Sequence, residues 1–313
     1  MHDPARNVGE HRRRGRGTAV GRHAVAATPV QPRSLAVTID DLAIEDGPLL
    51  SGEQKRAAIL AMLERHGVKA AGFPAGKHID SSTGKRYLAT WADRGHAIGC
   101  HSYAHAYYAG DDLAALVRDL DRALPLVSGY PTSVSLFHFP FLTEGNTALA
   151  RDAARATFRR RGLSNALVTI DTSDWYISSR LVERLRRDPT TDLTPFRRYY
   201  VAHLLDRAVF YDRLATQVLG RQIHDTILLH HNLTTALFLE DALQAVRADG
   251  WQIIDASQTF ANPVFRRQPM IVPAGQSLVW QLAKEHGGYD GVLRSPGEDG
   301  DFESRPWISL ACK

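Results

Sequence analysis

The chain has 313 residues, a length that suits one α/β barrel of the size such barrels commonly reach. Its hydrophobic fraction of 44% and charged fraction of 23% lie near the averages for globular proteins, so a sizeable core can be buried. Only Cys100 and Cys312 are present, which excludes a disulfide framework and any CxxC metal or redox motif.

The positive charge of the chain is unevenly placed. The formal net charge is +4, and much of the excess lies in a run of Arg12, Arg13, Arg14 and Arg16 without an apolar pattern. We expect residues 1–33 to form a disordered Arg-rich arm without a nucleic-acid partner. No apolar stretch predicts a membrane span or a signal peptide, so the expected location is cytoplasmic, with export possible if the true start differs.

From Ser34 onward, short β-branched apolar runs alternate with longer helical patterns, which is typical of repeated βα units. We expect a catalytic domain over residues 34–261, built as an α/β fold with parallel strands and surrounding helices. A C-terminal extension over residues 262–313 is expected to pack on it. Strands are predicted at Leu35 to Ile39, Val68 to Phe73, His96 to Cys100, Val134 to Phe139, Leu167 to Ile170, Thr226 to Leu229 and Gln252 to Ile254.

Helices are predicted between these strands. The first runs from Ser51 to His66, with Ser51 as N-cap, Gln54 at the third position and Gly67 at its C-terminal stop. Further helices are expected at Tyr87 to Arg94, Asp111 to Val127 and Ser277 to His286, and in a mainly helical insertion from Arg180 to Arg221 whose tyrosines we interpret as packing residues.

The C-terminal ends of the predicted strands carry polar residues, and in parallel α/β folds such ends gather at one site. Asp40 and Asp41 end the first strand, where one carboxylate can bind a metal while the other acts as a base. The alternative is that they only open a loop. His101 and His105 follow the third strand, and on a helical turn these two imidazoles would share a face and bind one divalent cation.

Three more segments follow apolar strands: 136–145 (LFHFPFLTEG), 169–175 (TIDTSDW) and 228–232 (LLHHN). Together with the first two, in this order, they resemble the five motifs of the polysaccharide deacetylase family, the NodB-homology carbohydrate esterases. The resemblance runs from about Leu35 to Phe260. It implies a distorted (β/α) barrel and a divalent metal, usually Zn²⁺ and sometimes Co²⁺ or another ion.

The resemblance also implies roles for individual residues. Asp41, His101 and His105 would be metal ligands, Asp40 the general base that takes the proton of the attacking water, and His230 the general acid. The metal and the backbone N–H of Phe141 would stabilise the oxyanion, and Trp175 would line the acetyl pocket, with a buried core aromatic as the alternative.

Two positions depart from the family pattern. His138 stands where the family has an arginine that pairs with the base and with a second aspartate, here Asp174. Because an imidazole is shorter than a guanidinium and is charged only near or below neutral pH, we expect reduced or acid-shifted activity. Leu42 stands where many members have Gly followed by Pro, which indicates a reshaped substrate loop.

The sequence therefore predicts a zinc-dependent carbohydrate deacetylase, a hydrolase of carbon–nitrogen bonds other than peptide bonds, with an acetylated carbohydrate as substrate. The alternatives are an O-acetyl esterase acting on acetylated polysaccharide and a catalytically weak sugar-binding homologue. Cys100 is expected to be a packed thiol and His231 an orienting or capping residue. The glycan, the native metal and the oligomeric state stay open.

Overall fold

The computed structural model describes Met1 and residues 32–293. The predicted arm falls almost wholly on residues outside this range, as does the part of the predicted C-terminal extension beyond residue 293. Within the described part of the chain, no helix has both the length and the apolar character needed to cross a membrane.

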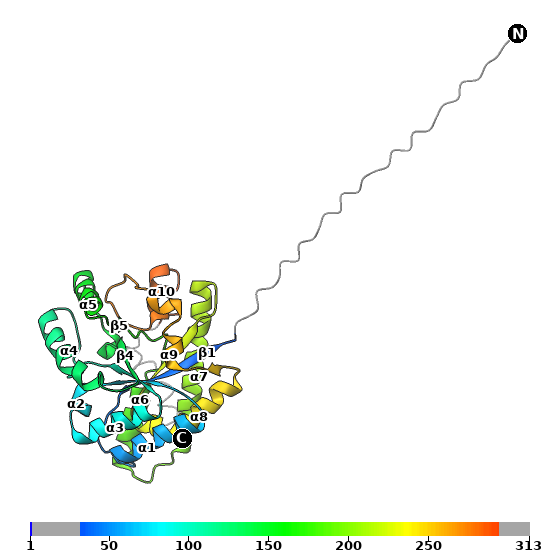
Figure 1. Cartoon of the computed structure of the whole chain (residues 1–313). Helices are drawn as coiled ribbons and strands as arrows, with labels where there is room; N and C mark the ends of the chain where they lie inside the picture. Colours follow the sequence, from blue (N-terminus) through cyan, green and yellow to red (C-terminus); the bar gives the residue numbers. More distant parts are fainter. Residues whose placement is uncertain (2–31, 294–313) are drawn as a thin grey trace. The chain divides into compact units, whose positions relative to one another are not determined.

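A parallel sheet forms the centre of the described chain. Its strands follow the order β5-β4-β3-β2-β1-β7-β6, and β8 pairs with the start of β1. The strands are β1 (Ser34–Asp41), β2 (Ala71–Pro74), β3 (Ala97–Cys100), β4 (Ser133–Phe137), β5 (Ser164–Asn165), β6 (Ile170–Asp171), β7 (His224–His230) and β8 (Gln252–Ile253). Helices surround this half-barrel sheet, so the predicted parallel α/β architecture is confirmed (Figure 1).

The helices up to α8 lie between the strands, as the alternating pattern predicted, and α9 and α10 follow the last strand. They are α1 (Gly52–Arg65), α2 (Gly76–Ile79), α3 (Ser82–Asp93), α4 (Leu113–Val127), α5 (Ala148–Arg160), α6 (Asp174–Arg187), α7 (Thr194–Leu219), α8 (Leu233–Ala248), α9 (Ala256–Thr259) and α10 (Leu278–His286). Two 3₁₀ turns are η1 (Pro140–Leu142) and η2 (Pro263–Arg266).

The predicted caps of the first helix are present. The Ser51 hydroxyl accepts the Gln54 N–H at 3.2 Å, and the Gln54 side chain accepts the Ser51 N–H at 2.8 Å. Gly67 follows the last turn with φ 63°, in the left-handed region that ends helices. The predicted capping box and stop signal are therefore confirmed.

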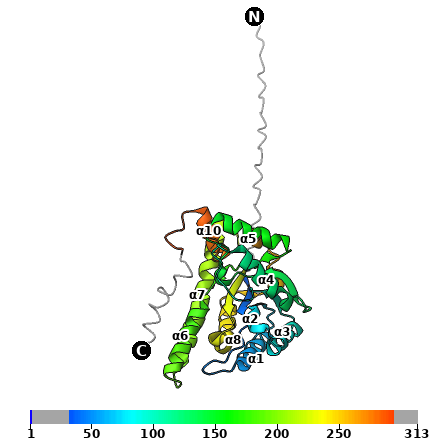
Figure 2. The same ribbon diagram turned by 90° about the vertical axis from the view of Figure 1, so that its left-hand side faces the viewer.

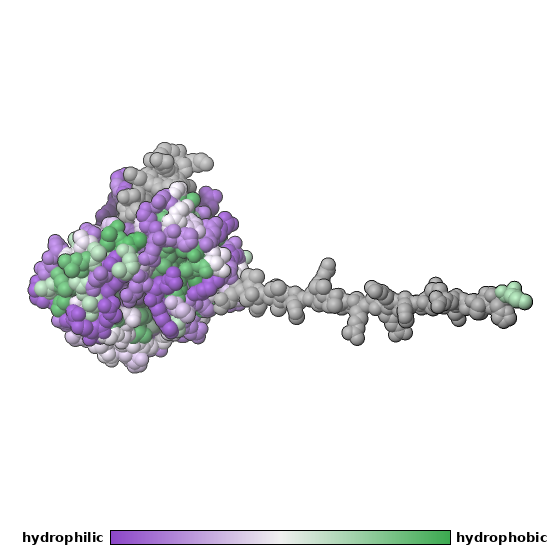
Figure 3. Space-filling view, turned by 90° about the horizontal axis from the view of Figure 1, so that it is seen from above, coloured by the Kyte–Doolittle hydropathy of each residue, from purple (hydrophilic) through white to green (hydrophobic). Residues whose placement is uncertain are grey.

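The predicted helical insertion consists of the end of α6 and the long helix α7. α7 packs against α8 and against α10, which lies near one of its ends (Figure 2). Tyr200 and Tyr211 on α7 are buried, which confirms them as packing residues. Hydrophilic and hydrophobic residues are mixed over the face seen in Figure 3.

β1 is the strand on which the site depends. All its residues from Ser34 to Asp40 are buried, and it pairs in parallel with β2, β7 and β8. A strand enclosed on both faces is held in register by packing, because a shift of one residue would exchange its two faces. Its C-terminal carboxylates therefore emerge at a defined place.

The neighbouring strands pack closely at a glycine. A Cβ at Gly99 of β3 would lie 2.3 Å from the Phe73 ring, well inside contact distance. We predict that Gly99→Ala lowers the free energy of unfolding by about 1–3 kcal/mol, because the buried ring must move. Urea denaturation measures this change. Gly129→Ala is the control, since a Cβ there meets nothing within 4 Å; equal stability of the two variants would contradict the prediction.

Candidate active site

The predicted site residues converge at the C-terminal ends of the strands. In the parallel register of β1 and β7, Asp40 lies opposite His230, and the backbone N–H of His231 donates to the Asp40 carbonyl at 3.0 Å. His101 directly follows β3, and His138 follows β4. The base and acid candidates are thus neighbours although 190 positions separate them in the sequence.

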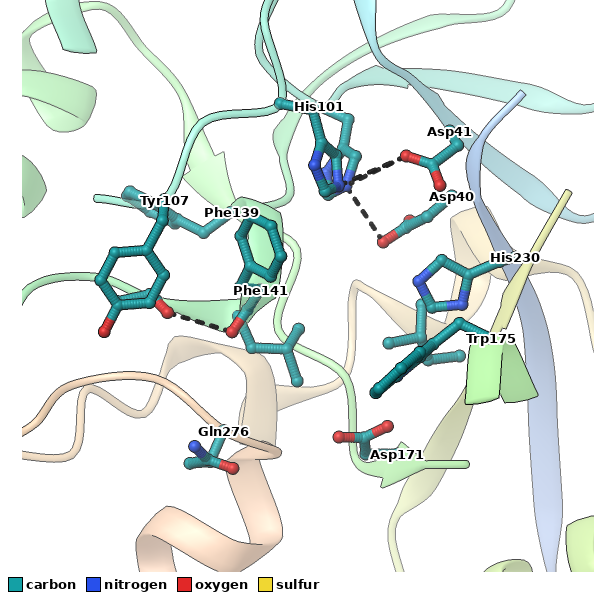
Figure 4. Close-up of a pocket in the computed structure, with 14 residues that line it drawn as sticks. Asp40, Asp41, His101, Tyr107, Phe139, Phe141, Asp171, Trp175, His230 and Gln276 are labelled. Atoms are coloured by element: carbon teal, nitrogen blue, oxygen red, sulfur yellow. Dashed lines mark hydrogen bonds and ion pairs between the residues drawn. The ribbon is translucent and has the colours of Figure 1, made fainter. Parts of the chain in front are cut away.

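Asp41, His101 and His105 form a group with metal-ligand geometry. The Nε2 atoms of His105 and His101 lie 3.4 Å and 3.9 Å from Oδ1 of Asp41, and all three ligand atoms lie within 4.8 Å of one another. Two imidazoles and a carboxylate are ligands that Zn²⁺ and Co²⁺ accept, and three protein ligands leave positions for water and substrate. Figure 4 shows His101 and Asp41 beside the pocket.

The hydrogen bonds of His101 present one nitrogen to this group. Its Nδ1 lies 2.8 Å from the carbonyl of His138, so it donates there and leaves the Nε2 lone pair toward the carboxylates. Burial lowers the pKa of His101 to about 4, although the adjacent Asp40 opposes this shift. The imidazole is therefore neutral, which is the form that binds metals.

The two histidines of this group are brought together by a loop. The prediction of a helical turn over His101 to His105 is wrong, because Ser102 and His105 have φ values of 62° and 56°, in the left-handed region. The His105 N–H donates to the Ser102 hydroxyl at 3.0 Å. Two further N–H groups of the loop donate to the Asp119 carboxylate on α4, at 2.6 and 2.8 Å. These hydrogen bonds replace those of a helix.

Asp40 is a buried carboxylate surrounded by histidines. Its Oδ2 lies 2.7 Å from Nδ1 of His138 and 3.5 Å from Nε2 of His101. Burial alone would raise the pKa of Asp40, but His138 and His101 outweigh it and lower the pKa to about 2. Asp40 is therefore ionised at all ordinary pH values. The ligand atoms of Asp40, His101 and His138 also lie within 4.8 Å of one another, as a second, wholly buried group.

Asp174 has a partner other than the expected one. The expected contact between His138 and Asp40 is present, but the carboxylate of Asp174, which is fully buried, bonds the acid candidate His230. Nδ1 of His230 lies 2.7 Å from Oδ1 of Asp174, and the His230 N–H donates to Oδ2 at 3.1 Å. Asn232 also donates to Oδ2, at 2.7 Å. The expectation that His138 acts on Asp174 is thereby corrected.

This pairing sets the charge of His230. Burial would lower the pKa of His230, but the adjacent Asp174 carboxylate outweighs it, and the pKa rises to about 10. Nδ1 is held by Asp174, so the remaining ring nitrogen is the one that can serve the pocket. His230 is protonated at neutral pH, the form that a general acid requires.

A pocket of about 580 Å³ opens over these groups. Phe141 and Trp175 line it, as predicted, and Trp175 is 46% exposed, so the alternative of a buried core aromatic is wrong. Asp174 and His138 are not among the residues that line the pocket. Seven further residues line the pocket and were not predicted from the sequence: Tyr107, Phe139, Leu142, Thr143, Asp171, Leu228 and Gln276. Five of these, Phe139, Leu142, Thr143, Asp171 and Leu228, lie inside the quoted motifs, whereas nothing in the sequence pointed to Gln276.

Backbone strain gathers around this pocket. Asp41, His105, Phe141, Leu142 and Gln276 line it with φ values of 70°, 56°, 58°, 56° and 74°. Left-handed backbone is unfavourable for residues other than glycine and persists only where packing and hydrogen bonds hold it. This concentration distinguishes the pocket from the rest of the described chain.

Two neighbouring residues do not belong to the candidate machinery. Cys100 is buried, and burial raises the pKa of its thiol to about 12, so it is a packed thiol as expected. His231 is buried against the Tyr87 ring, with 5.5 Å between ring centroids. The cap of α8 is Asn232, whose side chain accepts the Thr235 N–H at 2.9 Å, so His231 is not the capping residue.

The Asp174 contact leads to a test by NMR. In the wild type, the His230 ring should titrate near pH 10, because the carboxylate stabilises its protonated form. Asp174→Asn removes that charge, and the pKa should fall by at least one unit. The chemical shift of the His230 Cε1–H, followed against pH, measures this pKa. Asp111→Asn is the control, because Asp111 is an exposed carboxylate far from Asp174 and His230 in the sequence. An unchanged His230 titration in Asp174→Asn would contradict the assignment.

Comparisons with known proteins agree with this picture. Residues 27–159 match the family model described as Polysaccharide deacetylase, a segment that contains Asp40, Asp41, His101, His105 and His138. The curated proteins hold no significant match. A mutant of a CE4 family pseudoenzyme from Bacillus anthracis has 16% identity and a TM-score of 0.51, over 73% of this chain and 67% of its own.

The family 4 acetyl xylan esterase from Clostridium thermocellum, solved with a cobalt ion, has 18% identity and a TM-score of 0.50. The match covers 73% of this chain and 91% of that protein. At these identities the structural likeness shows the fold alone. The family match confirms the resemblance that the motifs predicted: residues 27–159 of this chain are similar to the polysaccharide deacetylase family.

Proposed function

We propose that this protein is a metal-dependent hydrolase that removes N-acetyl groups from an amino sugar in a glycan or glycoside. One observation carries the proposal: a single pocket joins a metal-ligand group to a buried, ionised carboxylate and a protonated imidazole on neighbouring strands. Amide hydrolysis needs these three parts, namely an electrophilic centre, a base and an acid.

Asp41, His101 and His105 would hold Zn²⁺ or Co²⁺. The chemistry of the donors fits such an ion, since two imidazole nitrogens and one carboxylate oxygen face one another. When bound, the ion would polarise the acetyl carbonyl and lower the pKa of the attacking water toward about 7.

Asp40 is suited to take the proton from this water. His138 contacts its Oδ2, whereas its Oδ1 is buried without a hydrogen-bond partner among the described residues. An ionised carboxylate oxygen without a donor is a ready proton acceptor, and the neighbouring histidines keep it ionised.

His230 is suited to complete the reaction. A C–O bond forms at the acetyl carbon, and the C–N bond then breaks as His230 gives its proton to the leaving nitrogen, with acetate and the free amine as products. The backbone N–H of Phe141 would stabilise the oxyanion, and one such donor is typically worth about 3 kcal/mol of the barrier. Trp175 would lie beside the acetyl methyl group.

Acetate release tests this function. The probes are N-acetylglucosamine oligomers and O-acetylated xylan, offered to metal-free protein and to protein with added Zn²⁺. We expect zinc-dependent release from the N-acetyl probes that falls at least about 100-fold in His101→Ala and Asp40→Asn. His286→Ala, at an exposed position, is the control. Release from the xylan alone would replace the proposal with an O-acetyl esterase, and no release from folded, zinc-loaded protein would reject it.

Zinc stoichiometry distinguishes the two groups that share His101. We expect His105→Ala to lose stoichiometric zinc at micromolar free metal and His138→Ala to keep it, because His138 serves Asp40. Equilibrium dialysis with elemental analysis measures both variants. Loss of zinc only in His138→Ala would show that the metal binds at the buried group of Asp40, His101 and His138 instead.

The missing arginine gives a further prediction. A guanidinium at position 138 carries its charge at every pH, so His138→Arg should raise the deacetylation rate at pH 8 severalfold relative to the wild type. Because the His138 ring packs 5.3 Å from that of His101 and 5.5 Å from that of Phe73, thermal melting must first show an intact fold. No gain at pH 8 in a folded variant would contradict this interpretation.

A further inference from the structure

A segment of the C-terminal region lines the pocket. Residues 268–276, here called the strap, connect η2 to the N-cap of α10, and Gln276 is the strap residue on the pocket wall. Figure 4 shows Gln276 across the pocket from Asp40 and Asp41. Gln276 also lies outside the segment that matches the family model. The family resemblance therefore assigns it nothing.

The strap is fixed to the catalytic region by a buried ion pair and a short backbone pairing. Arg155 on α5 donates to the buried Glu144 carboxylate at 2.6 Å and to the Pro269 carbonyl at 2.8 Å. Glu144 and Gly145 exchange backbone hydrogen bonds with Ala274, each of 2.8 Å. The strap is thus attached to the loop that follows η1, which itself lines the pocket.

The backbone around Gln276 is equally constrained. A Cβ at Gly275 would lie 2.1 Å from the Leu142 carbonyl oxygen, so only glycine allows this close approach. Gln276 itself has φ 74°, and its carbonyl accepts from the Gln281 side chain at 2.9 Å. A strained residue held from both sides has a defined side-chain direction, as a recognition residue requires.

The Gln276 side chain has unused hydrogen-bonding capacity. Its Oε1 is buried without a hydrogen-bond partner among the described residues. A carboxamide offers both an acceptor and donors, and a buried polar atom left unpaired is unfavourable, so a ligand that pairs with it gains affinity. A sugar hydroxyl or an acetamide group supplies both matching functions.

The pocket also has the surfaces and charge that suit a neutral sugar. Tyr107, Phe141 and Trp175 line it with side chains 54%, 59% and 46% exposed, and such apolar ring faces can stack on a sugar ring. No lysine or arginine is among the lining residues in the described part of the chain. Besides the metal-ligand group, the pocket is lined by the carboxylates of Asp40 and Asp171, which repel anions, and by His230. The charge of His230 is already paired with Asp174.

Two arginines of α5 contact the strap, and both are already engaged. Arg155 binds Glu144, and Arg151 donates to the Asp152 carboxylate at 2.8 Å and to the Met270 carbonyl. Neither is therefore available as a counter-ion for a charged sugar in the pocket.

We propose that Gln276 on the strap binds a hydroxyl or acetamide group of the substrate and selects a neutral acetylated sugar over one that carries a carboxylate. This inference rests on the proposed function, because it assumes that an acetyl group lies at the metal-ligand group. It makes Gln276 a specificity-determining residue supplied from outside the matched family region.

Binding affinity tests the role of Gln276 separately from turnover. In zinc-loaded Asp40→Asn protein, titration calorimetry with N-acetylchitotriose and O-acetylated xylotriose gives dissociation constants. We expect Gln276→Ala to weaken the better ligand at least tenfold, Gln276→Asn to lose less, and Gln268→Ala, an exposed glutamine of the same strap, to change nothing. Unchanged affinity in Gln276→Ala, or no binding of either sugar by the parent, would overturn the inference.

A charge substitution tests the selectivity. The parent should bind N-acetylglucosamine at least tenfold better than N-acetylmuramic acid, which carries an added carboxylate, and Gln276→Lys should narrow or reverse this ratio. An unchanged ratio in a folded Gln276→Lys protein would overturn the inference. Failure of the proposed function looks different: sugars bind in a Gln276-dependent way, but wild-type protein releases no acetate.

Discussion

The burial of a charged carboxylate at the end of β1 determines much of the architecture around it. Asp40 is 2% exposed, and an ionised carboxylate out of water is strongly unfavourable unless cationic or hydrogen-bonding groups surround it. His138 meets this need from the end of β4, and His230 stands opposite Asp40 in the sheet register. The same surroundings that stabilise the charge suit Asp40 to the proposed role of a base.

The site contains two carboxylate–imidazole pairs, Asp40 with His138 and Asp174 with His230. In the proposed reaction, the carboxylate of Asp40 would be the reactive member of the first pair, and His138 would support it. At Asp174, the carboxylate is the support, and it keeps His230 protonated. An acid and a base can work in one pocket when their surroundings move their pKa values apart. Loops with left-handed residues then bring the third part, the metal-ligand group, to the same place.

The sequence was informative where local patterns decide the structure. Asp40 and Asp41 could be assigned to the end of a buried strand because the apolar run before them stops abruptly, and convergence then followed from the rules for parallel sheets. The caps of α1 were predicted for the same local reason. The partner of Asp174 was missed because contacts between the ends of β7 and α6 depend on packing across the sheet, which no local pattern encodes.

Other features were beyond sequence reasoning for similar reasons. His101 and His105 approach each other through left-handed backbone that Asp119 holds from a distant helix, so helical spacing gave the right pair with the wrong local structure. Gln276 reaches the pocket because Arg155, Glu144 and Gly275 fix the strap. Its position depends on tertiary contacts over more than 100 residues, and the residue has no motif of its own.

The central claim is that a metal, held by two imidazoles and one carboxylate, lies beside Asp40 and His230. X-ray absorption at the zinc edge of stoichiometrically loaded wild-type protein tests this claim most directly. The account predicts nitrogen and oxygen neighbours at about 2.0–2.2 Å, with multiple scattering from two imidazoles and no sulfur. A sulfur neighbour near about 2.3 Å, or the scattering of fewer than two imidazoles, would contradict it.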